Sequence, residues 1–193
     1  QDDRDLRMQL QKEKKEKAYS FLIRIGPPGG IVSCQQWMVM QDLADEFGFK
    51  PLKITTRQAV QYHGVLKKVL KKTMQGINKA LLTSLAACGD VNRNVMCNPN
   101  PLQSVHHAAA QQLALDLTKG LLPRTTAYHE IWLDKKPVVG YKDVEPLYGP
   151  TYLPRKFKIA IAIPPSNDVD VFAHCLGFIA VIDKSKNELL GWN

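Results

Sequence analysis

The sequence predicts an α+β fold, and three observations lead to this prediction. Residues 18–85 show strand, helix, strand and helix patterns in turn, whereas residues 86–193 show one helical pattern followed mainly by strand patterns. The composition, with 45% hydrophobic and 23% charged residues, is that of a globular chain. A length of 193 residues is enough for one or two domains with a hydrophobic core.

Charge and cysteine content narrow the class of protein. The formal net charge of +8 and the isoelectric point near 9.3 favour an anionic partner. The four cysteines follow neither a zinc-binding spacing nor a CxxC pattern, so we expect reduced thiols, as in the cytoplasm. The longest apolar runs are far shorter than the roughly 20 residues that a membrane helix needs.

The first elements are a charged segment, a strand and a helix. Residues 1–17 are charged throughout, lack the apolar core of a secretory signal, and are expected to form a tail or a solvated helix. Residues 18–25 alternate apolar and polar side chains, with Arg24 on the less apolar face. The turn sequence GPPGG ends this strand. Ser33 and Gln36 then form a capping box, and the apolar spacing predicts a helix that stops at Gly48.

Residues 52–63 are predicted to form a second strand with an unusual polar face. In an extended chain the odd-numbered side chains share one side, and such a face is turned either to water or to an anion. That side would carry Lys53, Thr55, Arg57, Gln61 and His63. His63 by itself is more typical of a hydrogen-bonded histidine than of a metal ligand. A lysine-rich helix is expected over residues 65–85, which completes half of a ferredoxin-like unit.

The second part of the chain is expected to begin near residue 86. Residues 88–101 are rich in Asn, Gly and Pro and predict an ordered loop, in which Arg93 would more often bind local carbonyl groups than a ligand. A helix is expected over residues 104–119, with His106 and His107 exposed near its start. Strands are expected over residues 127–134, 155–163 and 170–183.

Lys156 and Lys158 share one face of the expected strand 155–163. Their ammonium groups would lie about 7 Å apart and repel each other unless an anion lies near them or the face is wet. No nucleophile elbow, P-loop, GxGxxG or HExxH motif occurs in the sequence. The residues alone therefore predict an anion-binding α+β protein but do not identify the anion.

Six segments carry a resemblance to a known family. They read FLIRIGPPGG, TTRQAVQYHGVLKK, LAACGDVNRNVMCNPNP, LLPRTTAYHEIWLD, EPLYGPTYLPRKFKIAIAIPPSNDVD and LLGWN. In this order they resemble the siroheme-dependent nitrite and sulfite reductase family, and within it the amino-terminal half of the assimilatory sulfite reductase hemoproteins. The resemblance implies a ferredoxin-like half-domain over residues 18–85 and the first part of a siroheme-binding α+β domain over residues 86–193.

The resemblance also implies an activity and roles for individual residues. Members of the family reduce sulfite to sulfide with six electrons, at a siroheme whose iron is bridged through a cysteine to a 4Fe-4S cluster. By motif, the side chains that surround sulfite would be Arg24, Arg93, Lys156 and Lys158. The contacts to the siroheme carboxylates would fall on Lys53, Thr55, Arg57, Gln61, His63, Asn92 and Arg155. Lys53 stands where an arginine is usual.

The sequence departs from the family in its cysteines. The family's cluster ligands form a C-x5-C pair and a later C-x3-C pair, and the 193 residues contain neither. We therefore expect these ligands in a carboxy-terminal half outside this chain, without which the reaction is not completed. The implied electron donor is a flavoprotein NADPH reductase subunit or ferredoxin, and no nucleic-acid or membrane partner is expected. A siroheme nitrite reductase portion, a basic RNA-binding module and a non-enzymatic assembly piece remain alternatives.

Overall fold

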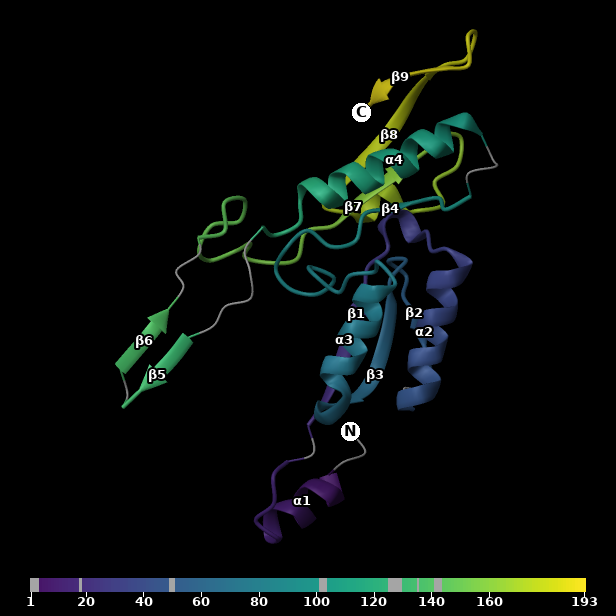
Figure 1. Cartoon of the computed structure of the whole chain (residues 1–193). Coiled ribbons are helices and arrows are strands. Elements are labelled where there is room, and N and C mark those ends of the chain that lie inside the picture. Colours follow the sequence, from purple (N-terminus) through teal and green to yellow (C-terminus); the bar gives the residue numbers. More distant parts are fainter. Residues whose placement is uncertain are drawn as a thin grey trace. The chain divides into compact units, whose positions relative to one another are not determined.

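The computed structural model describes residues 4–17, 19–48, 51–100, 104–124, 130–134, 136–140 and 144–193. The chain divides into two compact units (Figure 1). Unit 1 contains residues 1–27 and 32–84, and unit 2 contains residues 28–31 and 85–193. The chain thus passes into unit 2 at the GPPGG turn, returns to unit 1, and enters unit 2 again at Leu85.

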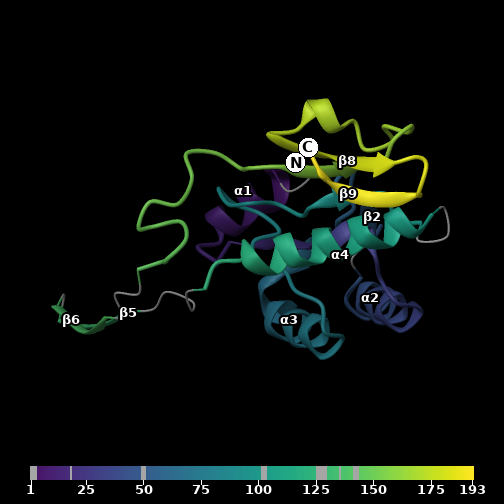
Figure 2. The ribbon, with the colours of Figure 1, turned by 90° about the horizontal axis from the view of Figure 1, so that it is seen from above.

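The described residues of unit 1 form a three-stranded antiparallel sheet and three α-helices. Its sheet has the order β1-β3-β2. The elements are α1 (Arg4–Lys12), β1 (Ser20–Ile25), α2 (Cys34–Phe47), β2 (Lys53–Ile54), β3 (Val60–Leu66), the 3-10 turn η2 (Lys67–Val69) and α3 (Leu70–Lys79). Figure 2 shows α2 and α3 side by side. A Cβ atom built on Gly76 of α3 would lie 2.6 Å from Leu43 of α2, so the glycine permits this close approach.

One face of the unit 1 sheet packs on the helices. Ile25 and Tyr62 of the sheet are fully buried with Met40 of α2 and Ile77 of α3. The Tyr62 hydroxyl donates to the Met40 carbonyl at 2.9 Å, and burial raises the pKa of this phenol above its ordinary value. The polar side chains of the sheet therefore have only the opposite face available.

The start and end of α2 confirm the sequence prediction. The Ser33 hydroxyl accepts from the Gln36 amide at 3.1 Å, and the Gln36 side chain accepts from the Ser33 amide at 3.0 Å. Gly48 ends the helix in the left-handed region, at φ 72°, where a residue without a Cβ is favoured.

Two predictions for unit 1 were wrong. Residues 52–63 form a hairpin of β2 and β3 and not one strand, because the chain turns at residues 55–58. The helix predicted over residues 65–85 is shorter, since β3 continues to Leu66 and α3 ends at Lys79. Leu81 adopts φ 57° and is 90% exposed, so it does not face the core as its spacing suggested.

Unit 2 is built on a four-stranded sheet with the order β4-β7-β8-β9. The strands are β4 (Met96–Cys97), β7 (Ile159–Ala162), β8 (Leu176–Asp183) and β9 (Glu188–Trp192). The first three run parallel, and β9 returns antiparallel to β8. The unit also has α4 (Val105–Gly120), the 3-10 turns η1 (Pro28–Gly30) and η3 (Val171–Ala173), and the separate hairpin of β5 (Glu130–Leu133) and β6 (Lys136–Gly140).

The core of unit 2 lies between α4 and the sheet. Ala110 and Ala114 of α4 pack against Cys97, Ile159 and Ile161. The turn η1 approaches the same region, where a Cβ atom on Gly29 would lie 2.9 Å from the Cys97 sulfur; Gly29 also has a φ of 59°. On the other face of the sheet, Ala160 and Ala162 pack against Val169 and Val171. Both faces of β7 are therefore covered, as its continuous apolar sequence requires.

The prediction that His106 and His107 are exposed was wrong. Both side chains are buried, at 6% and 7% exposure. A ring nitrogen of His107 lies 2.8 Å from the Ser104 hydroxyl at the start of α4. His106 pairs with Asn187, in the turn between β8 and β9, at 3.0 Å. These contacts give each imidazole a polar partner, which permits its burial.

The expected strands of unit 2 are present in part. In the range 155–163 only residues 159–162 form a strand, and in 170–183 the strand begins at Leu176 after η3. The range 127–134 contains β5, and residues 127–129 lie outside the described residues. The strands β4, β6 and β9 were not predicted. No helix among the described residues is long and apolar enough to cross a membrane.

Candidate functional site

The first candidate group lies on the helix-free face of the unit 1 sheet. Arg24 of β1 is opposite Gln61 of β3, and Gln61 is opposite Lys53 of β2. Directly paired residues project to the same side of a sheet, and His63 follows Gln61 by two positions on that side. We call these four residues, Arg24, Lys53, Gln61 and His63, the hairpin cluster.

The Gln61 amide connects the members of the hairpin cluster. With its oxygen turned to the guanidinium, Gln61 accepts from Arg24 Nη2 at 2.5 Å and from Arg24 Nε at 2.8 Å. Its nitrogen then donates to His63 Nε2 at 2.9 Å, so the proton of a neutral His63 is on Nδ1. Gln61 is 8% exposed and both ends of its amide are satisfied. The prediction of a hydrogen-bonded His63 agrees with this geometry.

Thr55 and Arg57 do not belong to the same strand face. They lie in the turn between β2 and β3, because the Thr55 amide donates to the Ala59 carbonyl at 2.8 Å and Gln58 adopts φ 53°. The Thr55 hydroxyl accepts from the amides of Arg57 and Ala59 at 3.3 and 3.1 Å. Its own hydrogen has no acceptor among the described residues and can donate. The shared polar face predicted for residues 53–63 is thus reduced to Lys53, Gln61 and His63.

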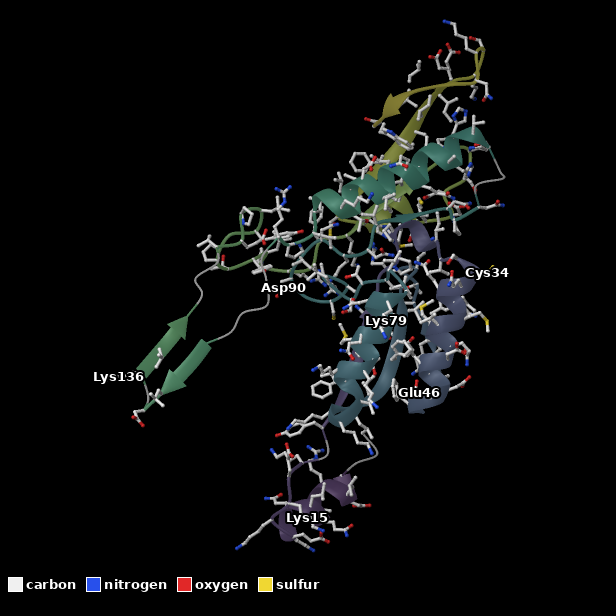
Figure 3. The ribbon with its side chains drawn as sticks, viewed as in Figure 1. Lys15, Cys34, Glu46, Lys79, Asp90 and Lys136 are labelled. Carbon is white, nitrogen blue, oxygen red and sulfur yellow. The ribbon has the colours of Figure 1, made fainter. Side chains whose placement is uncertain are left out.

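The second group lies in unit 2, where the loop before β4 runs beside the segment that leads into β7. The Arg93 amide donates to the Phe157 carbonyl at 2.9 Å, and the Phe157 amide donates to the Val91 carbonyl at 3.0 Å. These bonds form a parallel bridge between Asn92 and Phe157. Figure 3 labels Asp90 in this loop, and its carbonyl accepts from the Leu153 amide at 3.1 Å. The loop is therefore ordered, as predicted.

Basic side chains gather around this bridge. Lys156 and Lys158 flank Phe157 and, by strand alternation, project to the side of β7 that carries Ala160 and not to the side of α4. Arg93 neighbours Asn92 on the adjacent segment. We call Asn92, Arg93, Lys156 and Lys158 the loop cluster. Arg155 precedes it and is exposed.

Few described groups within the protein neutralise the positive charges of the loop cluster. Arg93 donates through Nε to the Gly89 carbonyl at 2.7 Å, as expected of an arginine in such a loop, and this bond uses one of its five N–H groups. Neither the Lys156 nor the Lys158 ammonium group has an ion pair or hydrogen bond with any residue that the structure describes. Both side chains are half-buried. Two adjacent, partly desolvated ammonium groups without a carboxylate are suited to bind an anion.

Asn92 is the least accessible member of the loop cluster. It is 7% exposed, and its Oδ1 atom is buried without a hydrogen-bond partner in the described part of the chain. Its backbone amide donates to the Tyr148 hydroxyl at 3.2 Å. The sequence prediction assigned no role to Tyr148. Its position in the motif EPLYGP gave no indication of a contact with a residue so distant in the chain.

The cysteines do not form a metal site within the described residues. Cys34, Cys88 and Cys175 are exposed, whereas Cys97 is buried, and burial raises the pKa of the Cys97 thiol to about 11. Among the described residues no group of three or more His, Cys, Asp or Glu side chains could hold a metal ion. The prediction that the cluster ligands lie outside this chain stays a prediction.

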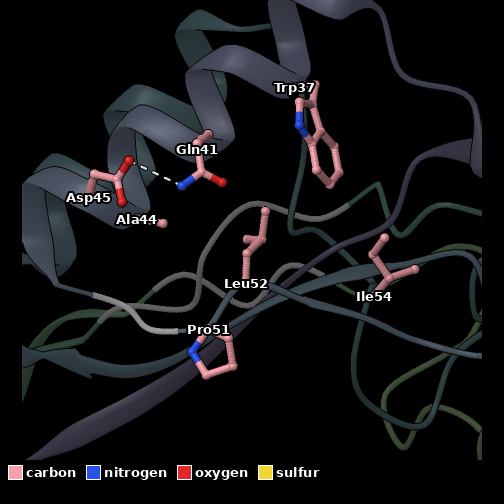
Figure 4. Close-up of a pocket in the computed structure, with 7 residues that line it drawn as sticks. All are labelled: Trp37, Gln41, Ala44, Asp45, Pro51, Leu52 and Ile54. Atoms are coloured by element: carbon pink, nitrogen blue, oxygen red, sulfur yellow. Dashed lines mark hydrogen bonds between the residues drawn. The ribbon is translucent and has the colours of Figure 1, made fainter.

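A separate groove lies between α2 and β2 in unit 1. It has a volume of 480 Å³ and its lining includes Trp37, Leu52 and Ile54 (Figure 4). The polar lining residues are Gln41 and Asp45, which share a hydrogen bond of 3.1 Å. The described lining residues therefore offer an apolar surface with one carboxylate.

Two family models match the chain in succession. Residues 12–80 match the "Nitrite/Sulfite reductase ferredoxin-like half domain", and residues 117–193 match the "Nitrite and sulphite reductase 4Fe-4S domain". The solved structure of the Mycobacterium tuberculosis NirA protein is similar over 93% of this chain and 29% of its own, with a TM-score of 0.60 and 22% identity. This likeness shows a common fold and confirms the predicted α+β class with a ferredoxin-like half-domain.

Curated relatives match over the whole chain. The sulfite reductase [NADPH] hemoprotein beta-component of Anoxybacillus flavithermus is 60% identical over 195 residues, and that of Geobacillus kaustophilus is 59% identical over 197 residues. The chain covers 34% of each of these relatives, so it spans about a third of their length and not the expected half. Because two successive models of one family and these relatives match it, the chain belongs to the nitrite and sulfite reductase family.

Proposed function

We propose that this chain supplies part of the siroheme and sulfite site of a sulfite reductase hemoprotein, which reduces sulfite to sulfide in sulfur assimilation. The observation that carries the proposal is the loop cluster, where Lys156 and Lys158 lack a counter-charge among the described residues. The names of the relatives, which are sulfite reductase hemoproteins, support the choice of anion.

The hairpin cluster fits a polycarboxylate such as siroheme. Lys53, Gln61 and His63 share one sheet face, and the bond from Gln61 fixes the direction of the His63 ring. An ammonium, an amide N–H and an Nδ1–H can all donate to carboxylate oxygens. Thr55 and Arg57 in the turn, and Asn92 and Arg155 in unit 2, complete the residues proposed to contact the siroheme carboxylates. When bound, siroheme would supply the electron transfer to sulfur.

The residues of this chain do not fit a 4Fe-4S cluster. Such a cluster is held by four cysteine thiolates, and the described residues bring no three candidate ligands together. We therefore derive no step through the cluster, and we propose that its ligands belong to the rest of the hemoprotein.

The proposed roles of the basic residues follow from their chemistry. Arginine stays protonated, so Arg24 and Arg93 would hold sulfite oxygens through their planar N–H groups. The ammonium groups of Lys156 and Lys158 would stabilise negative charge that develops on a departing oxygen, and each carries protons that the cleavage of S–O bonds consumes. The half-burial of both lysines strengthens their interaction with an anion, because less water screens it.

Partners and location are part of the same proposal. The NADPH in the names of the relatives supports a flavoprotein reductase subunit as electron donor, with ferredoxin as the alternative. The carboxy-terminal remainder of the hemoprotein is the second partner. A cytoplasmic location agrees with the reduced cysteines that the sequence predicts.

The proposal is tested in the full hemoprotein that contains this chain, produced with siroheme biosynthesis. Arg93→Ala should lower sulfite turnover by about 100-fold or more, while the siroheme absorption band is retained. Lys186→Ala, which removes an exposed lysine in the turn between β8 and β9, is the matched control and should leave turnover unchanged. Normal sulfite turnover in Arg93→Ala would contradict the proposed anion site. Faster turnover of nitrite than of sulfite in the wild type would favour a nitrite reductase.

A further inference from the structure

The hydrogen bonds of the loop cluster leave one backbone amide that the parallel bridge does not use. Val91 and Arg93 both bond to Phe157, so the amide between them, that of Asn92, points away from Phe157. A further strand would pair with such an amide, and here the Tyr148 hydroxyl takes that place at 3.2 Å.

Tyr148 connects this amide to the end of α4. Its hydroxyl donates to the carbonyl of Leu121, the residue that follows the last turn of α4, at 2.6 Å. The hydroxyl thus accepts from the loop and donates to the helix end at the same time. Burial raises the pKa of the Tyr148 phenol above its ordinary value, so the proton needed for the donated bond is retained.

The position of Tyr148 is itself fixed. Its ring stacks on Tyr152, with the centroids 5.6 Å apart and the planes 10° from parallel. The turn that contains it is closed by the Gly149 amide, which donates to the Glu145 carbonyl at 2.8 Å. The Glu145 carboxylate, only 3% exposed, accepts from the amides of Arg124 and Leu147 at 2.8 and 3.0 Å.

We propose that Tyr148 is a positioning residue of the loop cluster, which holds Asn92 and Arg93 in the geometry that binds the oxyanion. Tyr148 need not touch the anion; it acts through the backbone of Asn92. The inference rests on the proposed function, since it concerns the same anion site. A side chain that holds a loop by one amide should affect ligand affinity more than the chemical step.

The test compares two tyrosine-to-phenylalanine variants in the full hemoprotein. Tyr148→Phe keeps the ring that stacks on Tyr152 and removes the hydroxyl. Tyr62→Phe is the control, because it removes a hydroxyl that also donates to a backbone carbonyl, in the core of unit 1. Tyr148→Phe should raise the KM for sulfite by about 5- to 10-fold with a smaller change in kcat, and Tyr62→Phe should leave the KM unchanged.

Hydrogen exchange gives a readout that does not depend on activity. In Tyr148→Phe the Asn92 amide should exchange at least about 10-fold faster, whereas the Phe157 amide, bonded to Val91, should keep its protection. An unchanged KM in Tyr148→Phe would overturn the positioning role, even if Asn92 exchanges faster. A wild-type hemoprotein that does not turn over sulfite would instead overturn the proposed function, and that result is obtained before any variant is compared.

Discussion

The hairpin cluster and the loop cluster are both basic, but they hold their charges in different ways. In the hairpin cluster Gln61 bonds to Arg24 on one side and to His63 on the other. In the loop cluster Lys156 and Lys158 have no such partner among the described residues. The first cluster is ordered by its own network, whereas we propose that the second keeps its charge for a ligand.

This difference has an energetic consequence. Removing a member of a satisfied network leaves a buried polar group without its partner, which destabilises the fold. Removing one of two neighbouring like charges relieves repulsion and exposes no unsatisfied group. Breaking the Gln61 network should therefore lower stability, and removing Lys156 or Lys158 should lower function at nearly constant stability.

The largest effect is expected from the double substitution of Lys156 and Lys158 by glutamine. The hemoprotein should lose about 100-fold or more in sulfite kcat/KM, because both ammonium groups that we propose to face the anion are removed. Its free energy of unfolding should stay within about 0.5 kcal/mol of the wild-type value or rise. Steady-state kinetics and urea unfolding check the two parts. A large loss of stability would show that the two lysines stabilise the fold, and it would contradict the proposed difference between the two clusters.

A smaller effect, on stability, is expected from Arg24→Ala. This change removes both donors to the Gln61 oxygen, and Gln61 is buried, so we expect a loss of about 1–3 kcal/mol in the free energy of unfolding. Lys53→Ala is the matched control, since Lys53 is exposed on the same face and lies opposite Gln61. Urea unfolding of both variants is the measurement. Equal stabilities would mean that the network of Gln61 does not support the sheet.

Local signals in the sequence explain which parts of the fold could be predicted. The capping box of Ser33 and Gln36 and the end of α2 at Gly48 are decided by residues within one helical turn. The turn at residues 55–58 was missed because its sequence, Thr-Thr-Arg-Gln, contains no Gly, Asn or Pro. Gln58 adopts a positive φ, which is not typical of glutamine and so could not be predicted from the residue type. Leu81 and Leu85 fitted a helical stripe by spacing, although α3 had already ended.

The sequence supplied the residues of the candidate site, whose roles stay predictions, but it did not predict the hydrogen bonds between them. Alternation placed Lys156 and Lys158 on one side of their strand, and the resemblance supplied the expected roles of the site residues. The bonds that order the site join residues far apart in the chain, such as Arg24 to Gln61 and Asn92 to Tyr148. No local pattern encodes such pairs, because they arise only when the strands and loops have packed.

The smallest effect is expected from Thr55, and it tests whether this residue serves the turn or the ligand. Its hydroxyl accepts from the Arg57 and Ala59 amides, so Thr55→Ala should lower the free energy of unfolding by about 0.5–1.5 kcal/mol. Thr55→Ser keeps the hydroxyl and should restore most of this loss. If the turn is the main role, the siroheme absorbance per hemoprotein stays equal in both variants. A lower siroheme content in Thr55→Ala, at unchanged stability, would instead assign the hydroxyl to the cofactor, and the hairpin would then resemble the loop cluster in reserving a group for its ligand.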